Sequence, residues 1–75
     1  MERATVTSTA LASIGYDAEQ QILQIEFKDG DVYNYFDVPA WVFQGLMNAG
    51  SHGTYFDTTV KANGYRYEKV ETGGK

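Results

Sequence analysis

The sequence contains no cysteine, a single proline and a single histidine. Without cysteine there is no disulfide framework and no metal site built on thiolates. One histidine leaves only carboxylates as further metal ligands, and the Asp-Gly-Asp at 29–31 is too short for a calcium loop. No apolar run approaches the ~20 residues of a membrane-spanning helix. We therefore expect no metal or other cofactor, no membrane association and a cytoplasmic location.

Basic residues are also scarce. Six Lys and Arg stand against ten Asp and Glu, which gives a net charge of −4. This balance is unfavourable for following a phosphate backbone, where Lys and Arg replace condensed counterions. We expect no binding to duplex DNA. A local basic spot remains open, because Lys61, Arg66 and Lys69 lie within one short segment.

What the chain has in abundance is tyrosine. Six of its 75 residues are Tyr, and aromatic residues make up 15% of the sequence. Tyrosine combines an apolar ring with a polar tip, so it suits binding surfaces as well as cores. A single domain of this size buries a modest core, and association into a homo-oligomer is one way to add to it.

The apolar pattern predicts an α+β fold. Alternation predicts strands over 10–16, 21–28 and 31–38, and the last extended segment covers 65–70. Between them, a stripe of four apolar residues at helical spacing follows Pro39, and Ser51 can cap a second, short helix. We expect a small antiparallel sheet of three to four strands, packed on one face by these helices. The domain is expected over 7–70, with flexible ends at 1–6 and 71–75.

The hairpin around Asp29 decides where Tyr33 and Tyr35 point. If the Asp-Gly pair at 29–30 alone forms the turn, both tyrosines lie on the face opposite Ile25 and form an exposed platform. If Lys28 joins a three-residue loop with a bulge, the register shifts and both tyrosines join Ile25 in the core. The Asp-Gly pair favours the two-residue turn.

Several short motifs occur in an order that resembles one family. They are LASIGYD at 11–17, LxIxFxxG at 23–30, YxY at 33–35, VP at 38–39, a small-x-Gly-x-Tyr-Phe run at 51–56, and Tyr65 with Tyr67. Together they resemble the KTSC domain, named after the C-terminus of some lysyl-tRNA synthetases and also found as small stand-alone bacterial and phage proteins. The resemblance implies RNA binding as a candidate function. The acidic balance of this chain departs from general RNA binding.

Catalytic residue types are present but poorly arranged. Ser51, His52 and Asp57 are a nominal nucleophile, base and acid. Neighbouring side chains on a helix diverge by about 100°, which makes a direct contact between Ser51 and His52 awkward. A helix cap followed by an exposed histidine explains the pair better. We expect no enzymatic activity, and a hydrolase that uses His52 with a carboxylate is the weaker alternative.

The aromatic residues are the better candidates for a site. Base–aromatic stacking contributes ~1–3 kcal/mol per base and needs no net positive charge. We expect a non-catalytic module that binds a nucleotide-like small molecule or a short RNA segment. The expected ligand-binding residues are Tyr33, Tyr35, His52, Tyr55, Tyr65, Arg66 and Tyr67.

Alternative functions for the same aromatic residues remain open. Tyr55 shares a helix face with Val60, which favours a place in the core. Trp41 lies off the buried stripe of the first helix, where it suits a subunit contact or a ligand wall, and partial burial under the N-terminal arm is an equal alternative. The alternative function is therefore a protein-interaction or self-association domain with an exposed Tyr/Trp surface.

Overall fold

The computed structural model describes residues 2–71, with residue 71 by its backbone alone, and within them the chain forms an α+β fold. A five-stranded antiparallel sheet follows the order of the sequence. Its strands are β1 (Arg3–Thr5), β2 (Leu11–Asp17), β3 (Ile22–Phe27), β4 (Val32–Tyr35) and β5 (Tyr67–Glu71). The helical segments between β4 and β5 are α1 (Ala40–Asn48), α2 (His52–Tyr55) and the π-helix η1 (Phe56–Lys61). The expected fold class is confirmed, with more strands than the three or four predicted.

The additional strand lies where we expected a flexible N-terminal end. β1 pairs with β2, and Arg3 lies opposite Gly15. Nε of Arg3 donates a hydrogen bond to Oγ of Ser13 at 2.9 Å. A Cβ at Gly15 would lie 2.6 Å from the carbonyl oxygen of Glu2, so the missing side chain lets the two strands approach. Residues 72–75 of the expected C-terminal end lie outside the described part.

The β3–β4 hairpin has the register that the Asp-Gly pair disfavoured. Ile25 pairs with Tyr33, and the backbone N–H of Phe27 donates to the carbonyl of Asp31 at 2.9 Å. Residues 28–30 therefore form a three-residue loop, and the expectation of a two-residue turn is wrong. Gly30 has a φ of 95°, which is the left-handed residue that a three-residue loop with a bulge requires. The Asp-Gly pair is compatible with a two-residue turn and with a three-residue loop, so it does not by itself select the two-residue turn.

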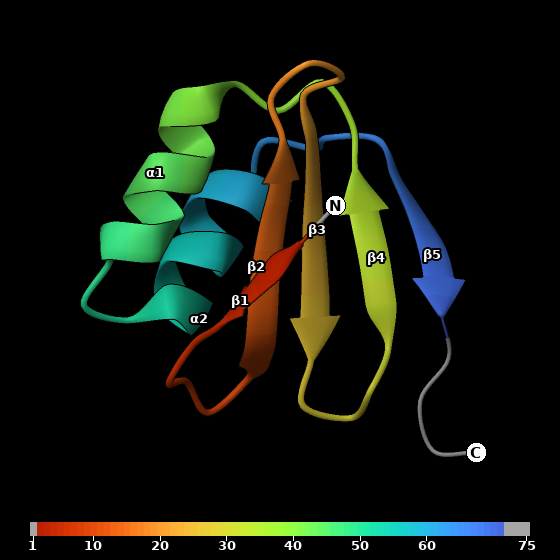
Figure 1. Ribbon diagram of the computed structural model, residues 1–75. Helices are drawn as coiled ribbons and strands as arrows, with labels where there is room; N and C mark the ends of the chain where they lie inside the picture. Colours follow the sequence, from red (N-terminus) through yellow and green to blue (C-terminus); the bar gives the residue numbers. More distant parts are fainter. Residues whose placement is uncertain (1, 72–75) are drawn as a thin grey trace.

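One hydrophobic core fills the space between the sheet and the helices. Its buried members are Leu11, Ile14, Leu23, Ile25, Tyr35, Val38, Val42, Leu46, Phe56 and Val60. α1 and α2 lie on the β2 side of the sheet, whereas β4 and β5 extend beyond them (Figure 1). The core face of the sheet is therefore covered by helices at one side and open at the other.

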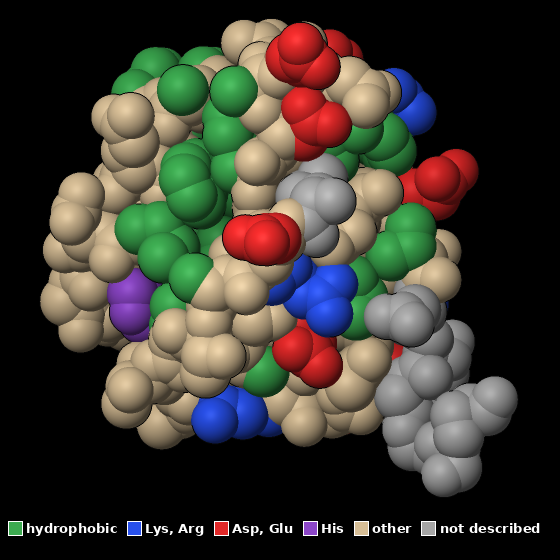
Figure 2. Space-filling model, in the orientation of Figure 1, with side chains coloured by type: hydrophobic (Ala, Val, Ile, Leu, Met, Phe, Trp, Pro, Cys, Tyr) green, Lys and Arg blue, Asp and Glu red, His purple; other side chains and the backbone are tan. Residues whose placement is uncertain are grey.

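Helix α1 buries the predicted stripe. Val42 and Leu46 are fully buried, and the ring of Phe43 stacks on Tyr16 with 5.0 Å between the ring centroids. No residue of α1 carries a charge, and Figure 2 shows hydrophobic side chains gathered on the helical side of the molecule. Within residues 2–71, no helix has the length and apolar character needed to cross a membrane.

The second helical segment begins at a side-chain cap and ends as a π-helix. Oγ of Ser51 accepts a hydrogen bond from the backbone N–H of Thr54 at 3.3 Å, which confirms the predicted cap. Further along, the N–H of Ala62 donates to the carbonyl of Asp57 at 3.2 Å, five residues back. This wider winding occurs mostly as short segments that are frequent at functional sites.

Candidate functional site

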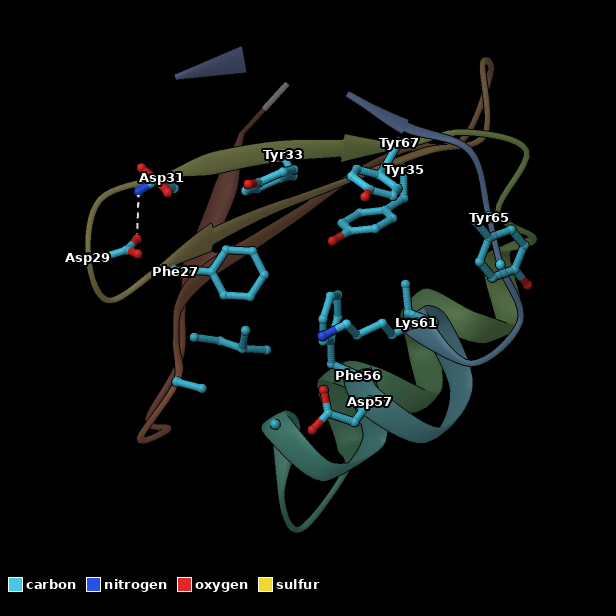
Figure 3. Close-up of a pocket in the computed structure, with 15 residues that line it drawn as sticks. Phe27, Asp29, Asp31, Tyr33, Tyr35, Phe56, Asp57, Lys61, Tyr65 and Tyr67 are labelled. Carbon is cyan, nitrogen blue, oxygen red and sulfur yellow. Dashed lines mark hydrogen bonds between the residues drawn. The ribbon is translucent and has the colours of Figure 1, made fainter. Parts of the chain in front are cut away.

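A cleft of about 480 Å³ lies between the open side of the sheet and η1. We call it the tyrosine pocket. Six aromatic residues line it: Phe27, Tyr33, Tyr35, Phe56, Tyr65 and Tyr67. The volume falls in the range of ~300–1,000 Å³ that is typical of small-molecule sites. Figure 3 shows the tyrosines of β4 and β5 on the sheet side and η1 on the opposite side.

The tyrosine rings form a continuous wall because of strand pairing. Tyr35 lies opposite Tyr67 on β5, and Tyr33 lies two residues before Tyr35 on the same face of β4. The ring centroids of Tyr35 and Tyr67 are 5.6 Å apart, and those of Tyr33 and Tyr67 are 5.9 Å apart. These rings are tilted by 34° and 54° relative to one another, so their faces line one side of the pocket.

Two phenylalanine rings stand against this wall at steep angles. Phe27 meets Tyr33 at 82° with 5.8 Å between centroids. Phe56 meets Tyr35 at 76° and Phe27 at 78°. Edge-to-face contacts of this kind favour a fixed arrangement of the rings. The end of the pocket next to the core is therefore preorganised.

The hydroxyl groups of the wall have no hydrogen-bond partner within the described chain. This applies to Tyr33, Tyr35 and Tyr67. Burial raises the pKa of Tyr35 to about 12, and the neighbouring Tyr33 and Tyr67 add to the shift. Because Tyr35 stays neutral at physiological pH, its hydroxyl can both donate and accept a hydrogen bond. The pocket thus offers aromatic faces together with polar tips.

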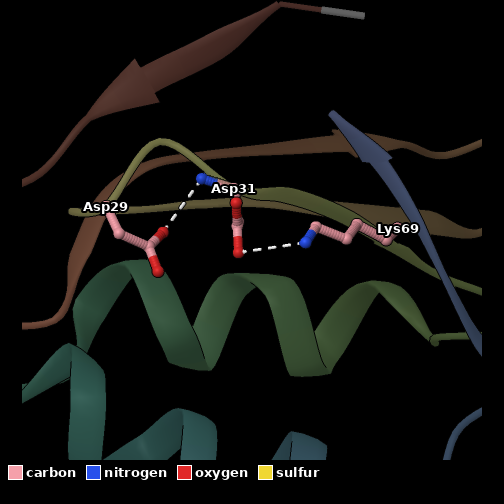
Figure 4. Close-up of polar contacts among 3 residues, drawn as sticks. All are labelled: Asp29, Asp31 and Lys69. Carbon is pink, nitrogen blue, oxygen red and sulfur yellow. Dashed lines mark hydrogen bonds and ion pairs between the residues drawn. The ribbon is translucent and has the colours of Figure 1, made fainter. Parts of the chain in front are cut away.

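Charged side chains at the pocket are mostly acidic. Asp29, Asp31 and Asp57 line it, and Lys61 is the only lysine or arginine of residues 2–71 that does. Asp31 pairs with Lys69 at 3.4 Å between Oδ2 and Nζ (Figure 4). Asp29 accepts a hydrogen bond from the backbone N–H of Asp31 at 2.9 Å, which fixes the hairpin loop. Within residues 2–71, the three carboxylates and one ammonium of the lining add up to a formal charge of −2, and the ion pair with Lys69 offsets the carboxylate of Asp31.

The π-helix contributes one whole side of the pocket. Phe56, Asp57, Val60 and Lys61 all belong to η1 and all line the cleft. In Figure 3 the Lys61 side chain extends across the pocket toward the Phe56 ring, and Asp57 lies beside Phe56. Neither the Asp57 carboxylate nor the Lys61 ammonium makes a hydrogen bond or ion pair within residues 2–71. Both charges are therefore available to a ligand.

The structure brings together four of the seven expected ligand-binding residues. These four are Tyr33, Tyr35, Tyr65 and Tyr67. Tyr33 and Tyr35 lie on the core face of the sheet and still line a pocket, because the helices leave that part of the face open. Tyr33 and Tyr35 therefore lie on the core face and also line a pocket. From the sequence alone, an exposed platform and a place in the core are exclusive alternatives.

The other three expected residues lie elsewhere. Tyr55 packs against α1, where a Cβ at Gly45 would come within 2.1 Å of its hydroxyl oxygen. Nδ1 of His52 lies 2.8 Å from the carbonyl oxygen of Leu46, and His52 lines a separate hydroxyl-rich cleft.

Arg66 is the third of these residues. Its guanidinium lies over the ring of Phe36, 4.1 Å from the centroid, and does not line the tyrosine pocket. Lys69 is paired with Asp31, and Lys61 stands on η1. The three cations that are close in sequence therefore do not form one basic spot.

Trp41 lies on the exposed side of α1. Its side chain is 61% exposed on α1. It lies outside the tyrosine pocket.

Sequence reasoning did not assign Phe27, Asp29, Asp57 or Lys61 to the site. Phe27 shared the apolar alternation of its strand, which signals core and nothing more. Asp57 and Lys61 are four residues apart, and that spacing signals a helix face without saying what it faces. Among residues 2–71, no group of three or more His, Asp or Glu is placed to hold a metal ion.

Comparison with known proteins identifies the family. Residues 7–67 match the model of the KTSC domain. The chain belongs to the KTSC domain family. The crystal structure of a KTSC domain protein from Yersinia pestis superimposes with a TM-score of 0.86 at 35% sequence identity, covering 93% of this chain and 97% of that one. The family expected from the motif order is confirmed.

Relatives of this KTSC domain occur alone and inside longer enzymes. An uncharacterized protein of Stutzerimonas stutzeri is 44% identical over 71 residues, which cover 95% of this chain and 100% of the relative. A lysine–tRNA ligase of Trichormus variabilis is 42% identical over 55 residues, which cover 73% of this chain and 10% of the ligase. A match to a tenth of the ligase identifies a shared domain and carries no ligase activity to this chain.

Proposed function

We propose that this KTSC domain is a non-catalytic binding module that holds the base of a nucleotide-type ligand in the tyrosine pocket. The ligand is a small free nucleotide or a nucleotide of a short RNA segment. The observation that carries the proposal is the wall of Tyr33, Tyr35 and Tyr67, whose rings adjoin and whose hydroxyls have no partner within residues 2–71. A cytoplasmic site of action is part of the same proposal.

The chemistry of the pocket suits a base. A planar ring gains ~1–3 kcal/mol from stacking on an aromatic side chain, whichever base it is. The phenol hydroxyls can meet the donors and acceptors on its edge. Carboxylates such as Asp57 accept hydrogen bonds from exocyclic amino groups, so an acidic lining is compatible with base recognition. The lysine–tRNA ligase relatives are named for joining lysine to tRNA, which makes RNA one molecule that such longer proteins meet.

The contacts of the nominal catalytic residues support a non-catalytic role. Oγ of Ser51 is engaged with Thr54, as acceptor from its N–H and as donor to its hydroxyl at 3.0 Å. His52 directs Nδ1 to the carbonyl of Leu46, and Asp57 lines a different cleft. A nucleophile and a base would need to contact each other.

Isothermal titration calorimetry with the four ribonucleoside 5′-monophosphates and a short single-stranded RNA tests the proposal. Tyr67→Ala should weaken binding about tenfold, the equivalent of one lost stacking contact. Trp41→Ala is the matched control, because the two side chains are 62% and 61% exposed and only Tyr67 lines the pocket. The proposal fails if no nucleotide or RNA binds, or if Tyr67→Ala binds as tightly as the unchanged protein.

A second function is favoured by Trp41. α1 presents this exposed tryptophan on a helix without any charged residue, and such surfaces suit protein contacts because charge is depleted at interface centres. The alternative is self-association or binding of another protein through α1. Light scattering would reveal a homo-oligomer whose mass falls to that of the monomer in Trp41→Ala. A monomer in both cases would refute self-association.

A further inference from the structure

Of the charges that residues 2–71 place at the tyrosine pocket, a single cation is open to a phosphate. Lys61 lines the pocket and is unpaired within residues 2–71. Lys69 does not line the pocket and is paired with Asp31 at 3.4 Å. Arg66 lies over Phe36 outside the pocket. The site therefore offers a phosphate one strong electrostatic contact.

The other charged side chains that line the pocket are carboxylates. Asp57 projects from the same π-helix as Lys61, and Asp29 and Asp31 occupy the hairpin end near Phe27 (Figure 3). Like charges in a partly enclosed cleft repel each other more strongly than in open water, because the surrounding protein lowers the effective dielectric constant. Lys61 can neutralise a single phosphate charge. Any further phosphate groups of the ligand would lie close to these carboxylates or outside the pocket.

We infer that the tyrosine pocket selects a nucleoside or nucleoside monophosphate and discriminates against the corresponding diphosphates and triphosphates. The aromatic wall binds the base, Lys61 binds a single phosphate, and the carboxylates set the upper limit on phosphate number. The inference rests on the proposed function and adds the ligand class that the site accepts. It also assigns Lys61 and Asp57 as specificity-determining residues, because the tyrosines bind the base and do not distinguish ligands by their number of phosphates.

Calorimetric titration of one base series tests this selection. The probes are the nucleoside and its 5′-mono-, di- and triphosphate, for each base that binds, in buffer with a chelator so that no divalent cation masks phosphate charge. The monophosphate should bind at least as tightly as the nucleoside, and the triphosphate should bind about tenfold or more weakly than the monophosphate. Raising the salt concentration should narrow that gap, because salt screens charge.

Two substitutions separate the roles of the charges. Lys61→Met should remove any preference for the monophosphate over the nucleoside, and Asp57→Asn should improve triphosphate binding several-fold. Lys28→Met is the control, since Lys28 lies outside the pocket lining. Circular dichroism of each variant reports whether the fold is retained.

The outcomes distinguish the inference from the proposed function. If affinity rises from monophosphate to triphosphate, the inference is overturned while the proposed function stands. If neither the nucleosides nor any phosphorylated form binds, the proposed function fails and the inference falls with it. If the triphosphate is rejected equally by the unchanged protein and by Asp57→Asn, the carboxylate does not set the limit and the inference is wrong.

Discussion

Ile25 and Tyr33 face each other directly across the β3–β4 hairpin, yet Ile25 is fully buried and Tyr33 is partly exposed. The helices lie on the β2 side of the sheet (Figure 1), and Tyr33 lines the tyrosine pocket whereas Ile25 does not. One pair of opposed residues thus marks the boundary between the core and the tyrosine pocket. Substitutions on the two sides of this boundary should act on different properties, namely stability at Ile25 and ligand binding at Tyr33.

The Tyr35 hydroxyl should lose its proton only at strongly alkaline pH. Its pKa is raised from 10.0 to about 12, chiefly by burial, so the folded state holds this proton after the unfolded state has released it. Stability from this group is complete below pH 10 and is lost as the pH rises through about 12. Phenolate absorbance should therefore show a late titration step, and Tyr35→Phe should reduce its amplitude.

Tyr16 is the internal reference for that titration. Burial, and then the adjacent Asp17 carboxylate, also raise its pKa, so one late-titrating tyrosine should remain in Tyr35→Phe. Circular dichroism recorded at each pH shows whether the chain is still folded. A late step of unchanged amplitude in Tyr35→Phe would contradict the assignment.

Gly15→Ala should detach β1. The new Cβ would lie 2.6 Å from the Glu2 carbonyl oxygen, a backbone atom that can move only if the strand moves. We expect a loss of about 1–3 kcal/mol in the free energy of unfolding, the usual cost of overpacking. Hydrogen exchange should speed up over Arg3–Thr5 before the rest of the sheet is affected.

Gly50→Ala is the control for that substitution. A Cβ at Gly50 meets no atom within 4 Å, and Gly50 is not among the residues with positive φ. The free energy of unfolding should stay within about 0.5 kcal/mol of the original value. If both substitutions are equally tolerated, β1 is not held against Gly15 in the way described.

The effect of Gly45→Ala on stability should depend on Tyr55. The substitution should destabilise the unchanged chain and stabilise a chain that lacks the Tyr55 side chain. In the unchanged chain, the new Cβ would lie 2.1 Å from the Tyr55 hydroxyl oxygen, so the ring must move and stability should fall. In a Tyr55→Ala background, the obstacle is gone and the helix preference for alanine over glycine remains, worth about 1 kcal/mol. Thermal unfolding of the four proteins of this cycle checks the reversal. Destabilisation in both backgrounds would show that Tyr55 is not the cause.

Much of this fold was predictable because its strands and helices have strong local patterns. The alternation through Leu23 and Ile25 and the stripe at Val42 and Leu46 both correspond to buried faces. The hairpin register was not predictable from Asp-Gly, since a left-handed glycine closes a two-residue or a three-residue loop equally well. β1 was missed because its three residues, Arg3–Thr5, are all exposed and form no apolar face.

The candidate site was predictable only where it follows the sheet. The Tyr-x-Tyr spacing placed Tyr33 and Tyr35 on one face of a strand, and the structure brings both to the pocket together with Tyr65 and Tyr67. The contribution of η1 depends on π-helical winding and on how far the helices extend over the sheet, neither of which a single sequence encodes locally. The placement of Arg66 on Phe36 is likewise a tertiary contact.

Arg66→Ala should leave nucleotide affinity within about twofold of the original. The guanidinium lies over Phe36 and does not line the tyrosine pocket, so its loss removes one surface cation–π contact and no ligand contact. Calorimetry with the tightest-binding monophosphate measures the effect. A tenfold loss would return Arg66 to the site and displace Lys61 as the phosphate contact.

The most direct test of the account is a map of backbone amide NMR shifts on addition of each ribonucleoside 5′-monophosphate. The tyrosine pocket predicts that the largest changes cluster at Tyr33, Tyr35 and Tyr67 on the sheet and at Asp57 and Lys61 on η1. Changes centred on Trp41 or His52, or no saturable change with any of the four nucleotides, would contradict it.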